Sequence, residues 1–413
     1  MKDLLRDSPL NFDRTTVSGD AEALVAHFLA QLLKFESNAR YRTRARKPID
    51  QAIFDEQVKA IVCDLLFNYL KPPKKRSGWL SVSLSHRLHG RHQLQNSTLG
   101  KTLELLEAMR FIRLEKGKIG TGLQTRLCLT VTASEWIDSQ RLRADDFKKK
   151  KPKQLIQLRS PKDEKKKYKL LDVDYDDPTV RGYLDEVLTL NSHYQSADIV
   201  YHAEDGTDDS DRFVYRVFTE GSFESCGRLY GGFWQGLSHE DRIEWITIND
   251  ENLALLDFGQ SALRLAYAEV GAVPPMTDLY AIPGYGRHRD FLKRRINQLL
   301  NTSDGSGFSY LPKALRSDGD SDERVIMRLM LDIAEFHKPI AHLFHSDIGQ
   351  RLMFKESEIV IDSLITMVSK GITALPVGDG VYVQESMIDD ALAVMTSTYV
   401  KHCGFEPLIT IER

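Results

Sequence analysis

The sequence predicts an α+β protein in which a helical domain with a β-hairpin precedes a domain built around an antiparallel sheet. Apolar residues recur at helical spacing over residues 20–70. Short strand-like runs follow, and those of the second half alternate with amphipathic helices. The 413 residues, of which 42% are hydrophobic and 28% charged, are enough for two or three globular domains.

The charge of the chain is unevenly distributed, although its formal net value is only −3. Basic residues crowd the first 170 positions, whereas the acidic run 204–211, which we interpret as a solvated loop, comes later. A basic front half predicts a polyanionic partner for that half. Four widely separated cysteines argue against a zinc site or a disulfide framework. Because no apolar run reaches membrane-spanning length and no signal peptide is visible, we expect a cytoplasmic protein without a membrane partner.

The front domain is predicted to span residues 1–143 and to end in a β-hairpin. After the first two helices, a polar turn leads to a third helix, roughly 96–109, with Ser97 as its N-cap. Two strand-like runs, 111–115 and 125–131, come next and are joined by the hairpin signal "KGKIGTG". A helix–turn–helix followed by a β-hairpin is typical of winged-helix domains, which bind DNA or RNA.

Basic residues around the predicted wing are candidates for contacts with nucleic-acid phosphates: Arg91, Lys101, Lys116 and Lys118. Such contacts position a protein on DNA or RNA without specifying the base sequence. A small α+β domain without a ligand, or one that binds another protein, would have the same pattern. The charge-dense residues 144–180 are predicted as an exposed linker, either a solvated tether or a segment that follows phosphates.

Two aspartates mark the second domain, which is predicted to span residues 181–413. Asp257 follows the apolar strand-like run 253–256, and Asp379 lies between two glycines in the tight turn of a predicted hairpin. On neighbouring strands, two such carboxylates would bridge a pair of Mg²⁺ or Mn²⁺ ions. An aspartate in a hairpin turn is also ordinary turn chemistry, so Asp379 alone would not indicate a metal site.

Cationic side chains of the second domain suggest a phosphate partner. The predicted helix 286–301 carries Arg289 and Lys293 on one face, a spacing that suits the clamping of a triphosphate. A solvated basic surface is the plain alternative for this helix. Arg228 lies in a loop rich in glycine and aromatic residues, which would either contact a primer backbone or form a packing turn.

The order of these segments resembles the palm-and-fingers core of family A DNA polymerases and single-subunit phage RNA polymerases. Asp257, with Arg264 seven residues later, resembles motif A of that family, D-x-S-x-x-E-x-R. Arg289 and Lys293 resemble the opening of motif B on the fingers helix, and Asp379 resembles the metal-binding aspartate of motif C. The resemblance implies a palm with an antiparallel sheet, a fingers helix and a two-metal centre.

The resemblance covers about residues 215–413. "CGRL" around Arg228 is similar to an element that precedes motif A, and the apolar helix 355–370 and the closing strand 405–413 match the family in place. The chain is also similar to small polymerase-like proteins of phages and mobile elements that join such a palm to an N-terminal helical domain.

Several positions depart from the family pattern. The histidine and the acidic or hydroxyl residue that flank the aspartate of motif C are Gly378 and Gly380, and later positions of motif B hold Asn297 and Asn301. Ala262 stands where the DNA polymerases have the glutamate that excludes a 2′-hydroxyl. The small side chain predicts that ribonucleotides are tolerated, as by a primase or an RNA polymerase.

The resemblance implies a template-dependent polymerase that uses nucleoside triphosphates and a DNA or RNA template and primer. Asp257 and Asp379 would hold Mg²⁺ or Mn²⁺, Lys293 would act as a catalytic cation, and Arg264 would support the palm by pairing with a carboxylate. The residues implied in substrate binding are Arg228, Gln260, Ala262, Arg264, Arg289, Asn297 and Asn301. Alternatives that remain open are a DNA-binding replication initiator or regulator with a degenerate palm, a metal nuclease and a template-independent transferase.

Overall fold

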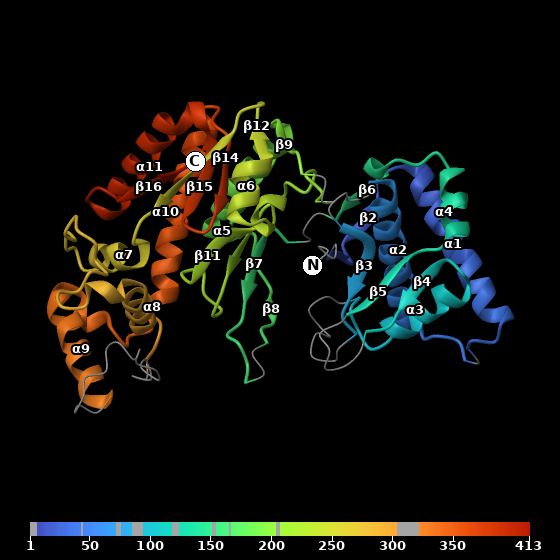
Figure 1. The fold of residues 1–413 in the computed structure, drawn as a ribbon, viewed down its shortest axis with the longest axis horizontal. Helices are drawn as coiled ribbons and strands as arrows, with labels where there is room; N and C mark the ends of the chain where they lie inside the picture. Colours follow the sequence, from blue (N-terminus) through green and yellow to red (C-terminus); the bar gives the residue numbers. More distant parts are fainter. Residues whose placement is uncertain are drawn as a thin grey trace. The chain divides into compact units, whose positions relative to one another are not determined.

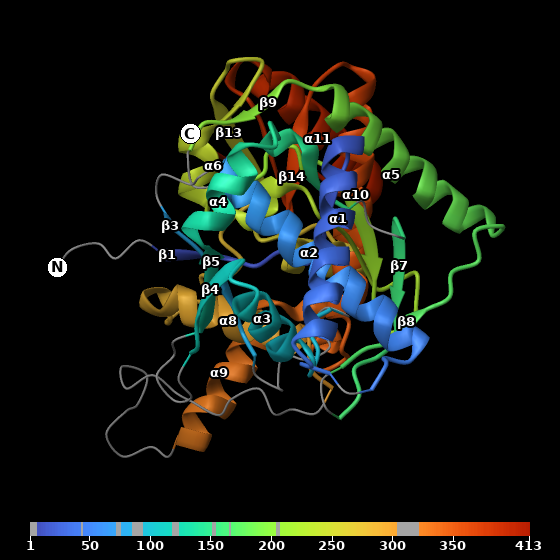
Figure 2. The ribbon, with the colours of Figure 1, turned by 90° about the vertical axis from the view of Figure 1, so that its right-hand side faces the viewer.

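The computed structural model describes residues 6–42, 44–71, 76–84, 94–117, 124–150, 154–164, 167–203, 207–303 and 322–413. The structure is mixed α+β, as predicted, and divides into two compact units (Figure 1 and Figure 2). The N-terminal unit comprises Met1–Lys151 and His202–Asp211, and the C-terminal unit comprises Pro152–Tyr201 and Arg212–Arg413. Across the described ranges, no helix has the length and apolar character needed to span a membrane.

The N-terminal unit combines helices with small sheets. Its described elements, in chain order, are β1 (Arg6–Pro9), β2 (Arg14–Thr16), α1 (Gly19–Asn38), α2 (Pro48–Leu70), β3 (Arg76–Val82), α3 (Leu99–Ala108), β4 (Ile112–Glu115), β5 (Thr125–Leu129), α4 (Val131–Asp138) and β6 (Phe147–Lys149). One sheet has the order β1-β3-β5-β4, with β1 parallel to β3 and the other pairs antiparallel. A second sheet pairs β2 with β6.

The helix α2 forms the centre of this unit, because its apolar residues face several directions. Val58, Ile61 and Leu66 are fully buried, and the helix contacts α1, α3, β3 and β5. The helices and the β4–β5 hairpin predicted from the sequence are present as α1, α2, α3 and their neighbouring strands. The predicted N-cap was wrong by one residue: α3 is preceded by Thr98, whose amide donates to Asn96 Oδ1 (2.9 Å).

The basic residues predicted to bind phosphates are only partly described. Lys101 is exposed on α3. Lys116 is exposed just after β4, where its amine pairs with Glu104 at 2.6 Å. Arg91 and Lys118 lie outside the described residues.

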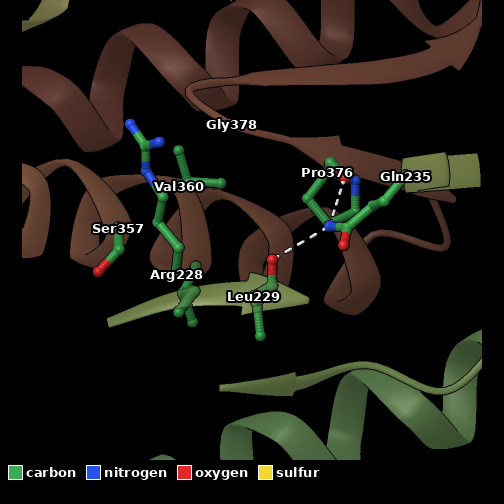
Figure 3. Close-up of a pocket in the computed structure, with 8 residues that line it drawn as sticks. Arg228, Leu229, Gln235, Ser357, Val360, Pro376 and Gly378 are labelled. Carbon is green, nitrogen blue, oxygen red and sulfur yellow. Dashed lines mark hydrogen bonds between the residues drawn. The ribbon is translucent and has the colours of Figure 1, made fainter. Parts of the chain in front are cut away.

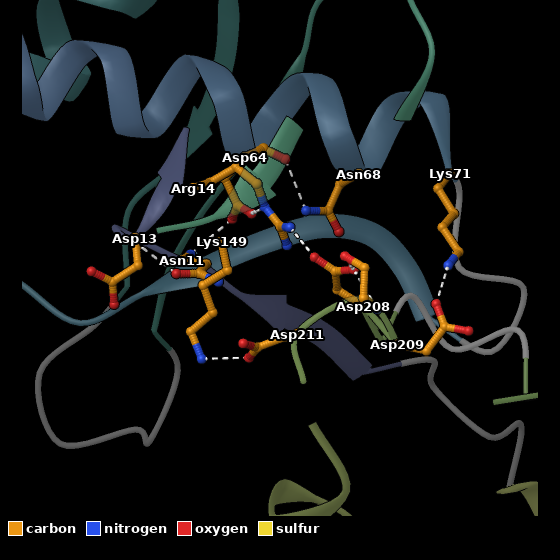
Figure 4. A network of polar contacts seen from close by, with 11 residues as sticks. Asn11, Asp13, Arg14, Asp64, Asn68, Lys71, Lys149, Asp208, Asp209 and Asp211 are labelled. Carbon is orange, nitrogen blue, oxygen red and sulfur yellow. Dashed lines mark hydrogen bonds and ion pairs between the residues drawn. The ribbon is translucent and has the colours of Figure 1, made fainter. Parts of the chain in front are cut away.

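The acidic run 204–211 is not the solvated loop that the sequence predicted. Its described part is fixed to the N-terminal unit by pairs with basic residues (Figure 4). Asp208 pairs with the buried Arg14, which also pairs with the buried Asp64 at 3.3 Å. Two further carboxylates of the run form ion pairs as well: Asp209 with Lys71 at 3.5 Å, and Asp211 with Lys149 at 2.7 Å. The negative charges therefore neutralise cations of the front half.

The C-terminal unit carries the residues that the sequence singled out. Its described elements, in chain order, are β7 (Ile156–Arg159), β8 (Leu170–Leu171), α5 (Pro178–Ser196), β9 (Ile199–Tyr201), β10 (Tyr215–Phe218), β11 (Cys226–Tyr230), α6 (His239–Trp245), β12 (Ile246–Ile248), β13 (Leu253–Phe258), α7 (Ser261–Glu269), α8 (Arg289–Leu300), α9 (Asp322–Phe336), α10 (Gly349–Ser369), β14 (Ala374–Val377), β15 (Gly380–Gln384), α11 (Ile388–Cys403) and β16 (Ile409–Glu412). The segment 144–180, predicted as a linker, contributes β6 to the N-terminal unit and β7 and β8 to this one.

An antiparallel sheet of order β14-β15-β13-β16 forms the frame of the site. A second sheet has the order β11-β10-β7-β8. The helix α10 lies centrally in this unit, since it contacts α5, α7, α11, β11 and β14. Its apolar residues pack on these neighbours, and Ile359, Leu364 and Met367 are almost fully buried.

Arg216 on β10 is a fully buried cation next to this helix. Its guanidinium pairs with Glu186 of α5 at 2.9 Å and with Glu358 of α10, and its Nε donates to the Gly227 carbonyl at 2.8 Å. The guanidinium also lies 4.3 Å from the centre of the Tyr183 ring. This one side chain therefore links α5, α10 and β11.

Candidate active site

Asp257 and Asp379 lie at the same end of two paired strands. Asp257, the next-to-last residue of β13, is opposite Gly380, the first residue of β15. Asp379 directly precedes this glycine, in the turn from β14. A Cβ atom built on Gly380 would lie 2.7 Å from Asp257 Oδ1. The absence of a side chain at Gly380 therefore leaves room for the Asp257 carboxylate.

The electrostatics of Asp257 identify its neighbours. Burial, followed by the negative charges of Asp379 and Glu356, raises the pKa of Asp257 to about 7. The positive charge of Lys293 acts in the opposite direction. Asp379 and Lys293, predicted from separate segments, thus lie within electrostatic reach of Asp257. So does Glu356, which the sequence did not indicate.

Glu356 on α10 connects the elements around the two aspartates. Its Oε1 accepts a hydrogen bond from Arg228 Nε on β11 (2.9 Å), and its Oε2 accepts one from Ser261 Oγ at the start of α7 (2.8 Å). Burial raises the pKa of Glu356, while the Arg228 guanidinium opposes that rise. The predicted primer-contacting Arg228 is therefore held by a carboxylate of its own unit. No local pattern singled out Glu356, because it stands among other polar residues of α10, next to Lys355 and Ser357.

Hydrogen bonds to β14 hold the turn that carries Asp379. The Pro376 carbonyl accepts from Gln235 Nε2 at 3.0 Å (Figure 3). It also accepts from Trp234 Nε1 at 3.2 Å. A cavity of about 10 Å³ lies beside these residues and Arg228, with room for roughly one water. The position of the Asp379 turn is thus fixed from outside the hairpin.

The helix α8 presents the predicted phosphate-binding cations. Arg289, at its first position, forms an ion pair with Asp278 through Nε and through Nη2 (3.2 Å to Oδ1). Lys293 is exposed one turn later. Its positive charge contributes to the lowered pKa of Asp278 and opposes the rise in the pKa of Asp257. Both cations therefore lie at one end of the helix, near carboxylates.

The two asparagines of α8 have different surroundings. Asn297 Oδ1 accepts a hydrogen bond from the hydroxyl of Tyr280 at 3.1 Å, and burial raises the pKa of this tyrosine to about 12. The negative charge of Asp379 also contributes to the raised pKa of Tyr280, which indicates that the Tyr280–Asn297 pair lies near the site. Asn301, predicted to bind substrate, lies past the end of α8. Its side-chain amide donates back to the Asn297 carbonyl and abuts Gly349, so its described contacts are not with the aspartates.

The predicted site residues that follow Asp257 in the chain divide between the site and the core. Gln260 has a left-handed backbone (φ 60°) and its Oε1 accepts from the Leu279 amide at 2.9 Å. Ala262 is half-buried on the first turn of α7. Arg264 is 1% exposed, and no described carboxylate pairs with it; its contact is the Pro275 carbonyl at 3.4 Å. The predicted carboxylate partner of Arg264 was therefore wrong, because the side chain is buried in the core. Its substrate contact stays a prediction.

The chemistry of the donor set fits Mg²⁺ or Mn²⁺. Within the described part of the chain, no three histidine, cysteine, aspartate or glutamate side chains form a ready metal cage. Mg²⁺ does not require one, since it keeps several waters and is commonly bound by one or two carboxylates together with substrate phosphates. Asp257 and Asp379 supply hard oxygen ligands of that kind.

The raised pKa of Asp257 predicts a pH-dependent cost to stability. Between about pH 4 and pH 7 this carboxyl group is ionised in the unfolded chain but still protonated in the folded one. The stability it contributes is therefore complete below about pH 4 and is lost as the pH rises to about 7. Asp257→Asn cannot titrate at this position. We therefore expect its melting temperature to exceed that of the wild type by more at pH 8 than at pH 5.

The measurement is thermal unfolding of both proteins at the two pH values, first with a chelator and then with Mg²⁺. Mg²⁺ is expected to raise the melting temperature of the wild type at pH 8, but not that of the variant. A difference between the two proteins that does not change with pH would contradict the assignment.

Comparisons with known proteins leave the family of this chain open. No family model matches the sequence, and no curated protein matches it. The structure is similar to the POL domain of Pol1 from M. smegmatis in complex with DNA primer-template and dNTP, with a TM-score of 0.33 and 12% identity. The match covers 96% of this chain and 66% of that chain. The function therefore has to come from the chemistry of the site itself.

Proposed function

We propose that this chain is a template-dependent nucleic-acid polymerase, which transfers a nucleotidyl group from a nucleoside triphosphate to a 3′-hydroxyl. The observation that carries the proposal is the position of Asp379, in the turn before β15, beside Asp257 on the paired strand β13, together with the effect of the Lys293 charge on Asp257. Two carboxylates facing a cationic helix are the groups that two-metal phosphoryl transfer uses. The α3 helix and the β4–β5 hairpin support a winged-helix role in nucleic-acid binding for the N-terminal unit.

Each side chain has a distinct task in this mechanism. Asp257 and Asp379 would hold Mg²⁺ or Mn²⁺, which when bound favours deprotonation of the attacking hydroxyl and neutralises phosphate charge. Lys293 would counter the charge that develops on the triphosphate and donate a proton to the leaving pyrophosphate. Arg289 would bind the phosphates, while Glu356 would keep Arg228 and Ser261 in place around the aspartates.

Extension of a labelled primer on a template, with Mg²⁺ or Mn²⁺ and each nucleotide set, tests the proposal. Template-dependent lengthening is the expected result. Degradation without nucleotides would indicate a metal nuclease instead, and lengthening of a single strand without template would indicate a terminal transferase. Controls without template and without primer separate these outcomes.

A second candidate is a replication initiator or regulator whose palm has lost activity. It is favoured by Asn301, which lies outside the site, and by Gly378, which stands in place of a histidine. Tight binding of DNA or RNA without any extension, under both metals, would support this alternative and overturn the polymerase.

The small side chain at position 262 predicts ribonucleotide use. Ala262 lies at the start of α7, five residues after Asp257, where a longer carboxylate would occupy space beside the sugar. We expect Ala262→Glu to lower the incorporation of ribonucleotides relative to deoxyribonucleotides by about tenfold or more, since a lost fit of a few kcal/mol has this effect. The measurement compares kcat/KM for both sugars. Ala268→Glu, on the same helix, serves as the control, and an unchanged ratio in Ala262→Glu would refute the prediction.

A further inference from the structure

We infer that Asp278 competes with the substrate: its carboxylate holds Arg289 where a phosphate of a nucleoside triphosphate binds, so that binding requires an exchange of anions. The inference rests on the proposed function, because it concerns the nucleotide site of that same activity. It assigns a task to a residue that the sequence motifs do not include.

The carboxylate of Asp278 lies where an anionic ligand of α8 would be expected. It accepts hydrogen bonds from Nε and Nη2 of Arg289, and the positive charge of Lys293 acts to lower its pKa. Although burial pulls the pKa of Asp278 upward, the Arg289 hydrogen bond and the Tyr280 amide (3.1 Å) hold it below its usual value. One carboxylate is thus stabilised by the same two cations that would clamp a triphosphate.

The exposure of the pair permits the exchange. The side chains of Arg289 and Asp278 are 45% and 29% exposed, and exposed ion pairs are weak. A triphosphate offers more charge and several oxygens to the planar guanidinium. The Arg228–Glu356 pair differs, because its carboxylate is only 7% exposed and also accepts from Ser261. Asp278 is therefore the carboxylate that a substrate can replace.

The position of Asp278 does not depend on Arg289. The next residue, Leu279, is buried; its amide donates to Gln260 Oε1 and its carbonyl lies 3.0 Å from Nε2 of the buried His337. Tyr280, also buried, is anchored to α8 by its hydroxyl. An asparagine at 278 would keep the side-chain oxygen that accepts from the Tyr280 amide. Asp278→Asn therefore removes the charge and leaves the anchors of the segment in place.

The test measures binding of inorganic tripolyphosphate, and of ATP with Mg²⁺, to the full chain by titration calorimetry. Asp278→Asn is expected to bind both probes about twofold to fivefold more tightly, because loss of the ion pair frees Arg289. In an Arg289→Ala background, the same substitution is expected to have no such effect. Asp290→Asn is the matched control, since it removes one exposed carboxylate from the adjacent position on α8.

Weaker binding by Asp278→Asn would overturn the inference, because it would make Asp278 a support of Arg289 rather than a competitor. A gain equal to that of Asp290→Asn, or one that persists without Arg289, would overturn it as well. Primer extension by the same proteins keeps the two proposals separate. Tighter binding without synthesis would refute the proposed polymerase activity but not the exchange of anions at Arg289. Synthesis with an unchanged nucleotide KM in Asp278→Asn would refute the exchange but not the polymerase activity.

Discussion

Asp257→Asn is expected to lower the rate of nucleotide addition by on the order of 10³-fold or more, with Asp379→Asn having a similar effect. Each substitution keeps the size of the side chain but removes one of two carboxylates that lie at the same end of the paired strands β13 and β15. A metal centre supplies several kcal/mol of transition-state stabilisation, which corresponds to a loss of this size. Because the two residues act as a unit, the double variant should be little worse than either single one.

The measurement is single-nucleotide extension under saturating Mg²⁺, together with binding of primer–template, which should change little. Asp250→Asn is the matched control, since Asp250 is an exposed residue of the turn before β13 with a positive φ that asparagine tolerates. Near-normal synthesis by Asp257→Asn would place the chemistry elsewhere in the chain.

Arg216→Met is expected to destabilise the C-terminal unit by about 3 kcal/mol, the largest stability effect we foresee for a single substitution. Methionine fills much of the volume but leaves the Gly227 carbonyl without its donor and brings Glu186 and Glu358 together without the cation between them. Breaking a buried pair costs about 3–5 kcal/mol. Because both glutamates are about one-third exposed, the lower end applies.

Urea unfolding followed by the fluorescence of the tryptophans, of which Trp234 is fully buried in this unit, measures the change. Arg181→Met on α5 is the control, because Arg181 and its partner Asp176 are 61% and 97% exposed. That substitution should cost less than about 0.5 kcal/mol. Equal effects of the two substitutions would show that the Arg216 cluster contributes little.

Local patterns in the sequence were sufficient to predict the elements that frame the candidate site. The apolar run before Asp257 predicted one strand, and the Gly-Asp-Gly turn around Asp379 predicted two more; the structure pairs the three as β13, β15 and β14. Helical periodicity likewise predicted α1 and α2, although α2 is buried on more than one side. Such signals lie within a window of about 11–18 residues, so they do not depend on contacts between distant segments.

The interactions that surround the aspartates could not be predicted in this way. Glu356 and Arg228 are 128 positions apart, and no sequence pattern around either residue indicates the other as its partner. Arg264 looked like a partner for a carboxylate, yet its helix turns it into the core. The strand β7 was hidden in a lysine-rich segment, because its neighbour β10 begins more than fifty residues later. Each of these features depends on contacts made only after distant segments meet.

The segment His202–Asp211 limits how the protein can be dissected. The backbone passes between the units at Lys151/Pro152, at Tyr201/His202 and at Asp211/Arg212. The N-terminal unit therefore includes ten residues that come later in the chain than its first 151. A fragment cut after Lys151 would expose Arg14 without Asp208, its acidic counterpart. Studies of the isolated N-terminal half should therefore graft this decapeptide back onto it.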